Sequence, residues 1–141
     1  MKKKKIFLIL ALILIAAIAL YFFNVYKTKS LVKDFLHADN LSEEINKIGV
    51  LDESTVTIAN VDKDNPTFPA LIDSLEDMKV KRSHSDFSLT EGYTLIIFHN
   101  NDSYHISVNE SGILQIDGKN YKVQENESMK ELFALIKKST Q

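Results

Sequence analysis

Residues 93–124 have the sequence YTLIIFHNNDSYHISVNESGILQIDGKNYKVQ, which contains four short segments rich in β-branched and aromatic residues. The segments cover 93–99, 103–109, 112–117 and 120–124, and turn-forming Asn, Asp, Ser or Gly residues separate them. Short strands joined by such turns form antiparallel hairpins. The sequence therefore predicts an antiparallel meander over this region.

The first hairpin of the meander has a register that its turn should fix. A two-residue turn at 101–102 is predicted to pair His99 with Tyr104. Because side chains alternate between the two faces of a strand, this register places four apolar residues on one shared face. These residues are Leu95, Ile97, Ile106 and Val108.

The last hairpin is predicted to turn at 118–119, with Gly118 at the position that needs a positive φ angle. This turn would oppose Ile116 to Tyr121 and so pair two apolar residues. The alternative is a turn at 117–118, which would oppose Ile116 to Lys119 instead. The turn at 118–119 is the one predicted, because it aligns apolar residues with apolar residues.

Two amphipathic helices flank the meander, and a β-branched run at 55–61 predicts a further strand before them. The helix predicted over 66–78 carries apolar residues three and four positions apart, and a short edge strand is predicted at 79–85. The closing helix, predicted over 128–138, begins with a capping box at Ser128 and Glu131. The predicted fold class is α+β, with a mainly antiparallel meander sheet of four to six strands and two amphipathic helices packed on one face.

An uncharged apolar run at 6–23 follows the four lysines at 2–5. As a helix it would span about 27 Å, close to the thickness of the hydrocarbon core of a bilayer. We therefore expect a single transmembrane helix. Four lysines precede the run and a thinner spread of three follows it by position 33, so the positive-inside rule favours a cytoplasmic N-terminus.

A cleavable signal peptide is the competing interpretation, because the small residues Ala17 and Ala19 resemble a cleavage site. Cleavage after Ala19 would leave a secreted protein, whereas retention leaves a single-pass membrane protein. The apolar run continues to Phe23, which favours retention. Both interpretations place the rest of the chain outside the cytoplasm.

Three regions are expected: a cytoplasmic lysine cap and transmembrane anchor at 1–26, a helical stalk at 27–52, and an extracytoplasmic α+β domain at 53–141. A short helix at 42–48 is predicted within the stalk. All 19 acidic residues but 13 of the 17 basic residues lie after position 26, so residues 27–141 carry a net charge of −6. This charge disfavours nucleic acid as a partner and favours an envelope protein or a cationic peptide.

Candidate residues for chemistry are few. The chain has no cysteine, which excludes disulfides and thiol nucleophiles. His84, His99 and His105 are the candidates for a metal or acid–base site, but the predicted register directs His99 and His105 to opposite faces of the sheet. No catalytic, cofactor-binding or metal-binding residue is therefore assigned, and no cofactor is expected.

The arrangement of the whole chain resembles small membrane-anchored or lipoprotein-like extracytoplasmic proteins of Gram-positive bacteria that are grouped as domains of unknown function. The segments that carry the resemblance are 93–97 and 112–123, and the likeness covers 55–138. It implies a Gram-positive cell envelope and supplies no activity.

Anchor, charge and predicted fold together favour a non-enzymatic, membrane-tethered protein-interaction module of the inhibitor, immunity or regulatory type. Its partner would be an envelope protein or a cationic peptide. The alternative is a metal-binding or hydrolytic envelope domain that uses His84, His99 or His105.

Overall fold

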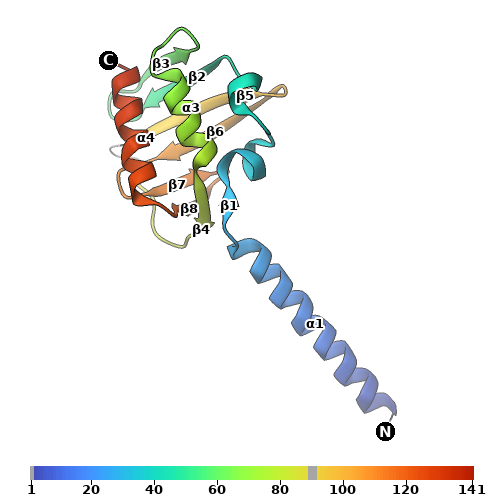
Figure 1. Ribbon diagram of the computed structural model, residues 1–141. Helices are drawn as coiled ribbons and strands as arrows, with labels where there is room; N and C mark the ends of the chain where they lie inside the picture. Colours follow the sequence, from blue (N-terminus) through green and yellow to red (C-terminus); the bar gives the residue numbers. More distant parts are fainter. Residues whose placement is uncertain (1, 89–91) are drawn as a thin grey trace.

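The computed structural model describes residues 2–88 and 92–141. Helix α1 (Lys2–Tyr26) projects from a domain in which helices cover one face of a single antiparallel sheet (Figure 1). The other elements in chain order are β1 (Lys29–Ser30), the π-helical turn η1 (Val32–Leu36), α2 (Leu41–Glu44), β2 (Lys47–Asp52), β3 (Thr57–Asp62), α3 (Phe68–Asp77), β4 (Lys79–Arg82), β5 (Tyr93–His99), β6 (Asp102–Val108), β7 (Ile113–Ile116), β8 (Lys119–Val123) and α4 (Asn126–Ser139). The α+β class predicted from the sequence is confirmed.

Over the described residues the sheet has eight strands, in the order β1-β4-β8-β7-β6-β5-β2-β3, and every neighbouring pair is antiparallel. The predicted meander forms its centre as β5 to β8. The predicted number of four to six strands was wrong because β1 and β2 come from residues 27–52, which were expected to form a stalk. The strand predicted at 79–85 is present as β4, but it lies between β1 and β8 and is not an edge.

Residues 27–52 belong to the folded domain and do not form a separate helical stalk. The helix predicted at 42–48 ends at Glu44, and β2 begins at Lys47. Apolar residues at 41, 45 and 48 fit helical spacing, but Ile48 and Val50 are fully buried on one side of a strand that pairs with both β3 and β5. Pairing on both sides of this segment has overridden its local helical pattern.

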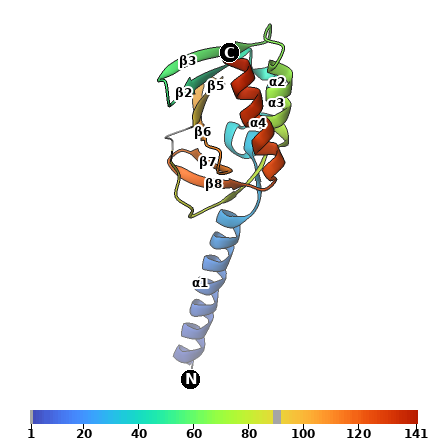
Figure 2. The same cartoon turned by 90° about the vertical axis from the view of Figure 1, so that its left-hand side faces the viewer.

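The core lies between the sheet and the helices α3 and α4, which pack on the same face (Figure 2). Both predicted apolar stripes are buried: Phe68, Leu71, Ile72 and Leu75 on α3, and Met129, Leu132, Phe133 and Ile136 on α4. The predicted capping box was wrong, because α4 begins at Asn126 with Glu125 as its N-cap residue. Ser128 lies inside the first turn, where its hydroxyl donates to Glu125 Oε2 at 3.4 Å.

The β5–β6 turn lies at Asn100 and Asn101, which both have positive φ angles of 50° and 65°. His99 therefore pairs with Asp102, and the predicted pairing of His99 with Tyr104 was wrong. A two-residue turn of this type needs positive φ at both positions, which Asn tolerates better than most residues. The register differs from the predicted one by two residues, so the predicted apolar face is correct and all four of its residues are fully buried.

The β7–β8 turn lies at Asp117 and Gly118, with φ angles of 50° and 69°. Ile116 is opposite Lys119, so the predicted turn at 118–119 and the pairing of Ile116 with Tyr121 were wrong, and the alternative is correct. The physical reason is again the demand for two consecutive positive φ angles. Asp-Gly meets that demand, whereas Gly-Lys would force a long side chain into the left-handed region.

Replacement of Gly118 by Val is expected to lower the free energy of unfolding by about 1 to 3 kcal/mol. A Cβ at this position would meet no atom within 4 Å, so the cost arises from the φ angle of 69° and not from a clash. Gly118→Asn is the matched control, since Asn adopts positive φ more readily and should cost less. Urea unfolding of the three proteins measures the difference, and equal midpoints would contradict the strain at this turn.

Candidate functional site

The three candidate histidines lie in separate environments. His84 follows β4 next to the end of α1, where its Nε2 lies 2.5 Å from the hydroxyl of Tyr26. His99 is buried on the helix-covered face of β5, and His105 is exposed on the opposite face of β6. The prediction that His99 and His105 point to opposite faces is confirmed. Among residues 2–88 and 92–141, no three His, Cys, Asp or Glu side chains form a group that could hold a metal ion.

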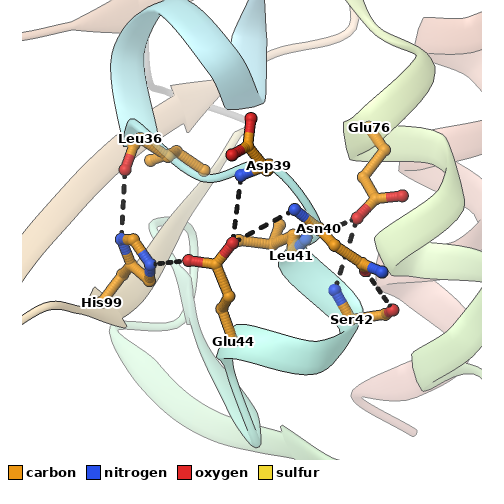
Figure 3. Close-up of polar contacts among 8 residues, drawn as sticks. All are labelled: Leu36, Asp39, Asn40, Leu41, Ser42, Glu44, Glu76 and His99. Carbon is orange, nitrogen blue, oxygen red and sulfur yellow. Dashed lines mark hydrogen bonds and ion pairs between the residues drawn. The ribbon is translucent and has the colours of Figure 1, made fainter.

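His99 joins the sheet to the segment before β2 (Figure 3). Its Nδ1 lies 3.1 Å from the carbonyl oxygen of Leu36, and its Nε2 is paired with Glu44 Oε2. Both partners are acceptors, so an imidazolium can donate to both at once. The other carboxylate oxygen of Glu44 accepts the backbone N–H groups of Asp39 and Asn40 at 3.0 and 3.1 Å.

Glu76 of α3 completes this cluster from the other side (Figure 3). Its Oε1 accepts the backbone N–H groups of Leu41 and Ser42 at 2.6 and 3.3 Å. The segment 36–44 is thus fixed to β5 by His99 and to α3 by Glu76. The described contacts occupy both ring nitrogens of His99, so the cluster has a structural role in fastening this segment.

Stability is expected to fall on acidification partly through Glu44. The N–H of Asn40 and then the ring of His99 hold the pKa of the Glu44 carboxyl below its usual value. A carboxyl with a lowered pKa in the folded state stabilises the fold above its unfolded pKa and loses that contribution as pH falls through the folded value. Glu44→Gln should therefore reduce the loss of thermal stability between about pH 5 and pH 3.

The matched control for that change is Glu43→Gln, because Glu43 precedes Glu44 on α2 and is exposed. Melting temperatures measured across the acid range compare the two variants with the unmodified protein. A Glu44→Gln variant with the same pH dependence as Glu43→Gln would contradict the role of the cluster.

The sheet face opposite α3 and α4 carries exposed apolar side chains. Outside α1, the exposed large hydrophobic residues among those described are Val56, Ile58 and Phe98, with exposed fractions of 79%, 64% and 56%. The registers place Ile58 and Phe98 on this open face, together with half-buried Leu51 and Ile96. We call Ile58, Leu51, Ile96 and Phe98 the apolar patch.

The apolar patch lies at the end of the sheet that is remote from α1. Strand β1 follows α1 directly and forms one edge of the sheet, whereas β3 forms the other edge. Seven strand spacings separate the two edges, which corresponds to roughly 34 Å. Figure 1 shows β3 at the opposite end of the domain from α1.

Two grooves flank α4. One, of about 580 Å³, lies between α4 and the β6–β7 turn, and its lining includes Glu110, Gly112, Lys130, Phe133 and Lys137. The other, of about 390 Å³, lies between α3 and α4 and is acidic, with a lining that includes Asp73, Asp77, Glu125, Glu127 and Glu131. Neither groove contains a candidate histidine.

Sequence reasoning identified the strand at 55–61 but not its position at the sheet edge. The signal within the chain is weak, because Ile58, Asn60 and Asp62 alternate with Ala59 and Val61 as they would in any half-buried strand. The order of strands depends on contacts that the local sequence does not carry.

Comparison of the chain with protein-family models, curated proteins and solved structures found no match.

Proposed function

We propose that this protein is a membrane-tethered extracytoplasmic protein-interaction module of the inhibitor, immunity or regulatory type, without catalysis. The observation that carries the proposal is the apolar patch, which lies on an open sheet face at the end of the domain remote from α1. Contiguous exposed apolar surface on a soluble domain is typical of a site for a partner. Its distance from the anchor would leave it accessible above a membrane surface.

The tether in this proposal is α1. Residues 3–26 of this helix are long and apolar enough to cross a membrane, and none of that length is buried in the protein. A cleaved signal sequence would have the same character. We favour a retained anchor because α1 continues without a break through Ala19 to Tyr26, which contacts His84 of the domain.

The partner is proposed to be an envelope protein or a cationic peptide. Residues 27–141 carry a net charge of −6, which attracts basic surfaces and repels nucleic acid and anionic lipid. The setting we propose is the envelope of a Gram-positive bacterium, as the resemblance implies.

The proposed topology predicts that a reporter active only outside the cytoplasm will function when fused after Gln141. Replacing the four lysines at 2–5 with neutral residues should reduce that activity, because their retention on the cytoplasmic side orients the helix. Neutral replacement of Lys137 and Lys138, which lie in α4, is the matched control and should leave reporter activity unchanged. Activity of a cytoplasmic reporter at the same position would contradict the topology.

Crosslinking of the intact protein in its native membranes tests the function itself. We expect a discrete crosslinked species from a photoreactive residue at position 58, and none from one at position 122, which lies on the same face away from the apolar patch. Bound zinc in the purified protein that is lost in a His84→Ala, His105→Ala double variant would overturn the proposal in favour of a metal-binding domain. His99 is left intact in that variant because it holds the fold together.

A further inference from the structure

The backbone N–H and C=O groups of β3 point alternately toward β2 and away from the sheet. In the register of the β2–β3 ladder, the N–H of Lys63 donates to the carbonyl oxygen of Asn46 at 3.1 Å. Antiparallel strands alternate between residues that bond to the neighbour and residues that point away from it. Residues 57, 59 and 61 therefore bond to β2, and the N–H and C=O groups of Ile58 and Asn60 point outward from the sheet. The N–H of Asp62 also points outward, whereas its carbonyl oxygen accepts the N–H of Asn65 at 3.0 Å.

The other side of β2 gives the same alternation independently. The N–H of Glu53 donates to the carbonyl oxygen of Gly92 at 3.1 Å, in register with the β2–β5 ladder. The odd-numbered residues of β2 thus bond to β5, and the even-numbered ones bond to β3. Since β3 is the last strand of the sheet, the outward groups of Ile58 and Asn60 and the N–H of Asp62 pair with no other strand among the described residues.

This edge lacks the devices that usually prevent further pairing. Natural edge strands are commonly protected by lysine, proline or a bulge, and β3, with the sequence TIANVD, has no lysine or proline and pairs with β2 without interruption. Ile58 is 64% exposed and lies beside Leu51 of β2 on the open face. Val56, in the turn before β3, adds a side chain that is 79% exposed.

A second copy of the chain fits this edge poorly. Symmetric antiparallel pairing about Asn60 would place Ile58 opposite Asp62 of the other copy, and pairing about Ala59 would place Ile58 opposite Asn60. Pairing Ile58 with itself would leave only a short overlap before the turn at 53–56. Each copy also carries a net charge of −6 over residues 27–141, so the copies repel each other.

A basic extended segment matches the same features. Asp62 is exposed at the end of the outward-pointing row, and Asp64 follows it in the next turn. Asp52 and Glu53 lie at the other end of the β2–β3 hairpin. The outward-pointing row of β3 therefore runs from the apolar side chain of Ile58 to the carboxylate of Asp62.

We propose that β3 binds an extended segment of a partner protein by β-strand addition, with an apolar residue opposite Ile58 and a lysine or arginine opposite Asp62. Strand addition supplies affinity through main-chain hydrogen bonds and specificity through alternate side chains. The inference rests on the proposed interaction function and identifies the surface and the chemistry of the partner.

A synthetic peptide that alternates Val and Thr between terminal lysines tests the edge on the full-length protein in detergent micelles. We expect binding that slows amide exchange at Ile58, Asn60 and Asp62, and that weakens as salt is raised. A peptide of the same length with proline at the central positions should not bind, because it cannot donate the main-chain hydrogen bonds.

Three variants separate strand addition from simple apolar contact. Asn60→Pro removes an outward N–H without breaking a bond to β2 and should weaken binding about five- to tenfold. Ile58→Ser should also weaken binding, and it keeps the inference testable if the proline variant fails to fold. Lys122→Ser is the matched control, because Lys122 is exposed on the same face but lies outside the apolar patch on β8, five strands from the edge, and this variant should bind as the unmodified protein does.

Binding that is unaffected by both Asn60→Pro and Ile58→Ser, or no binding at all, would overturn strand addition at β3. The interaction function can still be judged separately by crosslinking in native membranes. A crosslinked partner that forms equally well with the edge variants would leave the interaction module standing and remove only the binding mode. If the unmodified protein gives no crosslinked species, both the interaction function and strand addition at β3 would be contradicted.

Discussion

A fragment that begins at Glu53 is expected to remain unfolded, whereas a fragment of residues 27–141 is expected to fold. The β-branched run at 55–61 predicted a domain boundary at 53, but β2 ends at Asp52 and connects β3 to β5. Without β2, strand β3 loses the one neighbour that it has in the described part of the chain, and β5 acquires an unpaired edge. An isolated strand of this length has no independent stability.

The buried side chains that the shorter fragment lacks indicate how much stability it loses. Among the described residues, eight buried hydrophobic residues precede Glu53, and six of them are Leu31, Leu36, Leu41, Ile45, Ile48 and Val50. Burial of such a side chain stabilises a fold by about 1.5 to 3 kcal/mol, so the loss of these six amounts to roughly 9 to 18 kcal/mol. A domain of this size has a total stability of about 5 to 15 kcal/mol.

Far-UV circular dichroism and urea unfolding of the two fragments measure this difference. A matched fragment of residues 45–141 restores β2 but not the segment held by His99, and its stability should be intermediate or too low to detect folding. A cooperative unfolding transition for residues 53–141 would show that β2 is dispensable and that the boundary predicted from the sequence is sufficient.

The alternation of apolar residues predicted which faces of the meander are buried, but not the exact register. Leu95 and Ile106 lie on the buried face in both the predicted and the observed pairing, because a shift of two residues preserves the face. The register itself depends on which two residues can adopt positive φ. Asn100 and Asn101 both adopt positive φ and form the turn. The predicted turn at 101–102 contains Asn and Asp, which are chemically so similar to the two asparagines that the local sequence did not distinguish the two turns.

The segment before Glu53 was mistaken for a stalk because short apolar runs fit both a helix and a strand. Its assignment is decided by partners that lie far along the chain. Leu36 and His99 are 63 positions apart, and Glu44 and His99 are 55 positions apart. The same distance in sequence hides the edge position of β3, which follows from the order of all eight strands and not from any residue within it.

Replacement of Phe133 by alanine is expected to lower the free energy of unfolding by about 3 to 5 kcal/mol. Phe133 is 8% exposed, and its ring packs edge-on against Tyr93 of β5 with 5.3 Å between the ring centroids. The loss of stability has two sources: the hydrophobic free energy of burying the aromatic side chain, and the cavity that its removal leaves between α4 and the sheet. Water from the neighbouring groove at Glu110 to Gly112 would partly fill that cavity.

The matched control on the same helix is Lys130→Ala, because the side chain of Lys130 is 76% exposed and its ion pair with Glu127 spans 3.8 Å. An exposed pair of this kind contributes little, so Lys130→Ala should change stability by less than about 0.5 kcal/mol. Urea unfolding of full-length protein in micelles compares both variants with the unmodified chain. A loss for Phe133→Ala below about 1 kcal/mol would mean that α4 contributes little to the core, since a well-packed aromatic side chain cannot be removed at so small a cost.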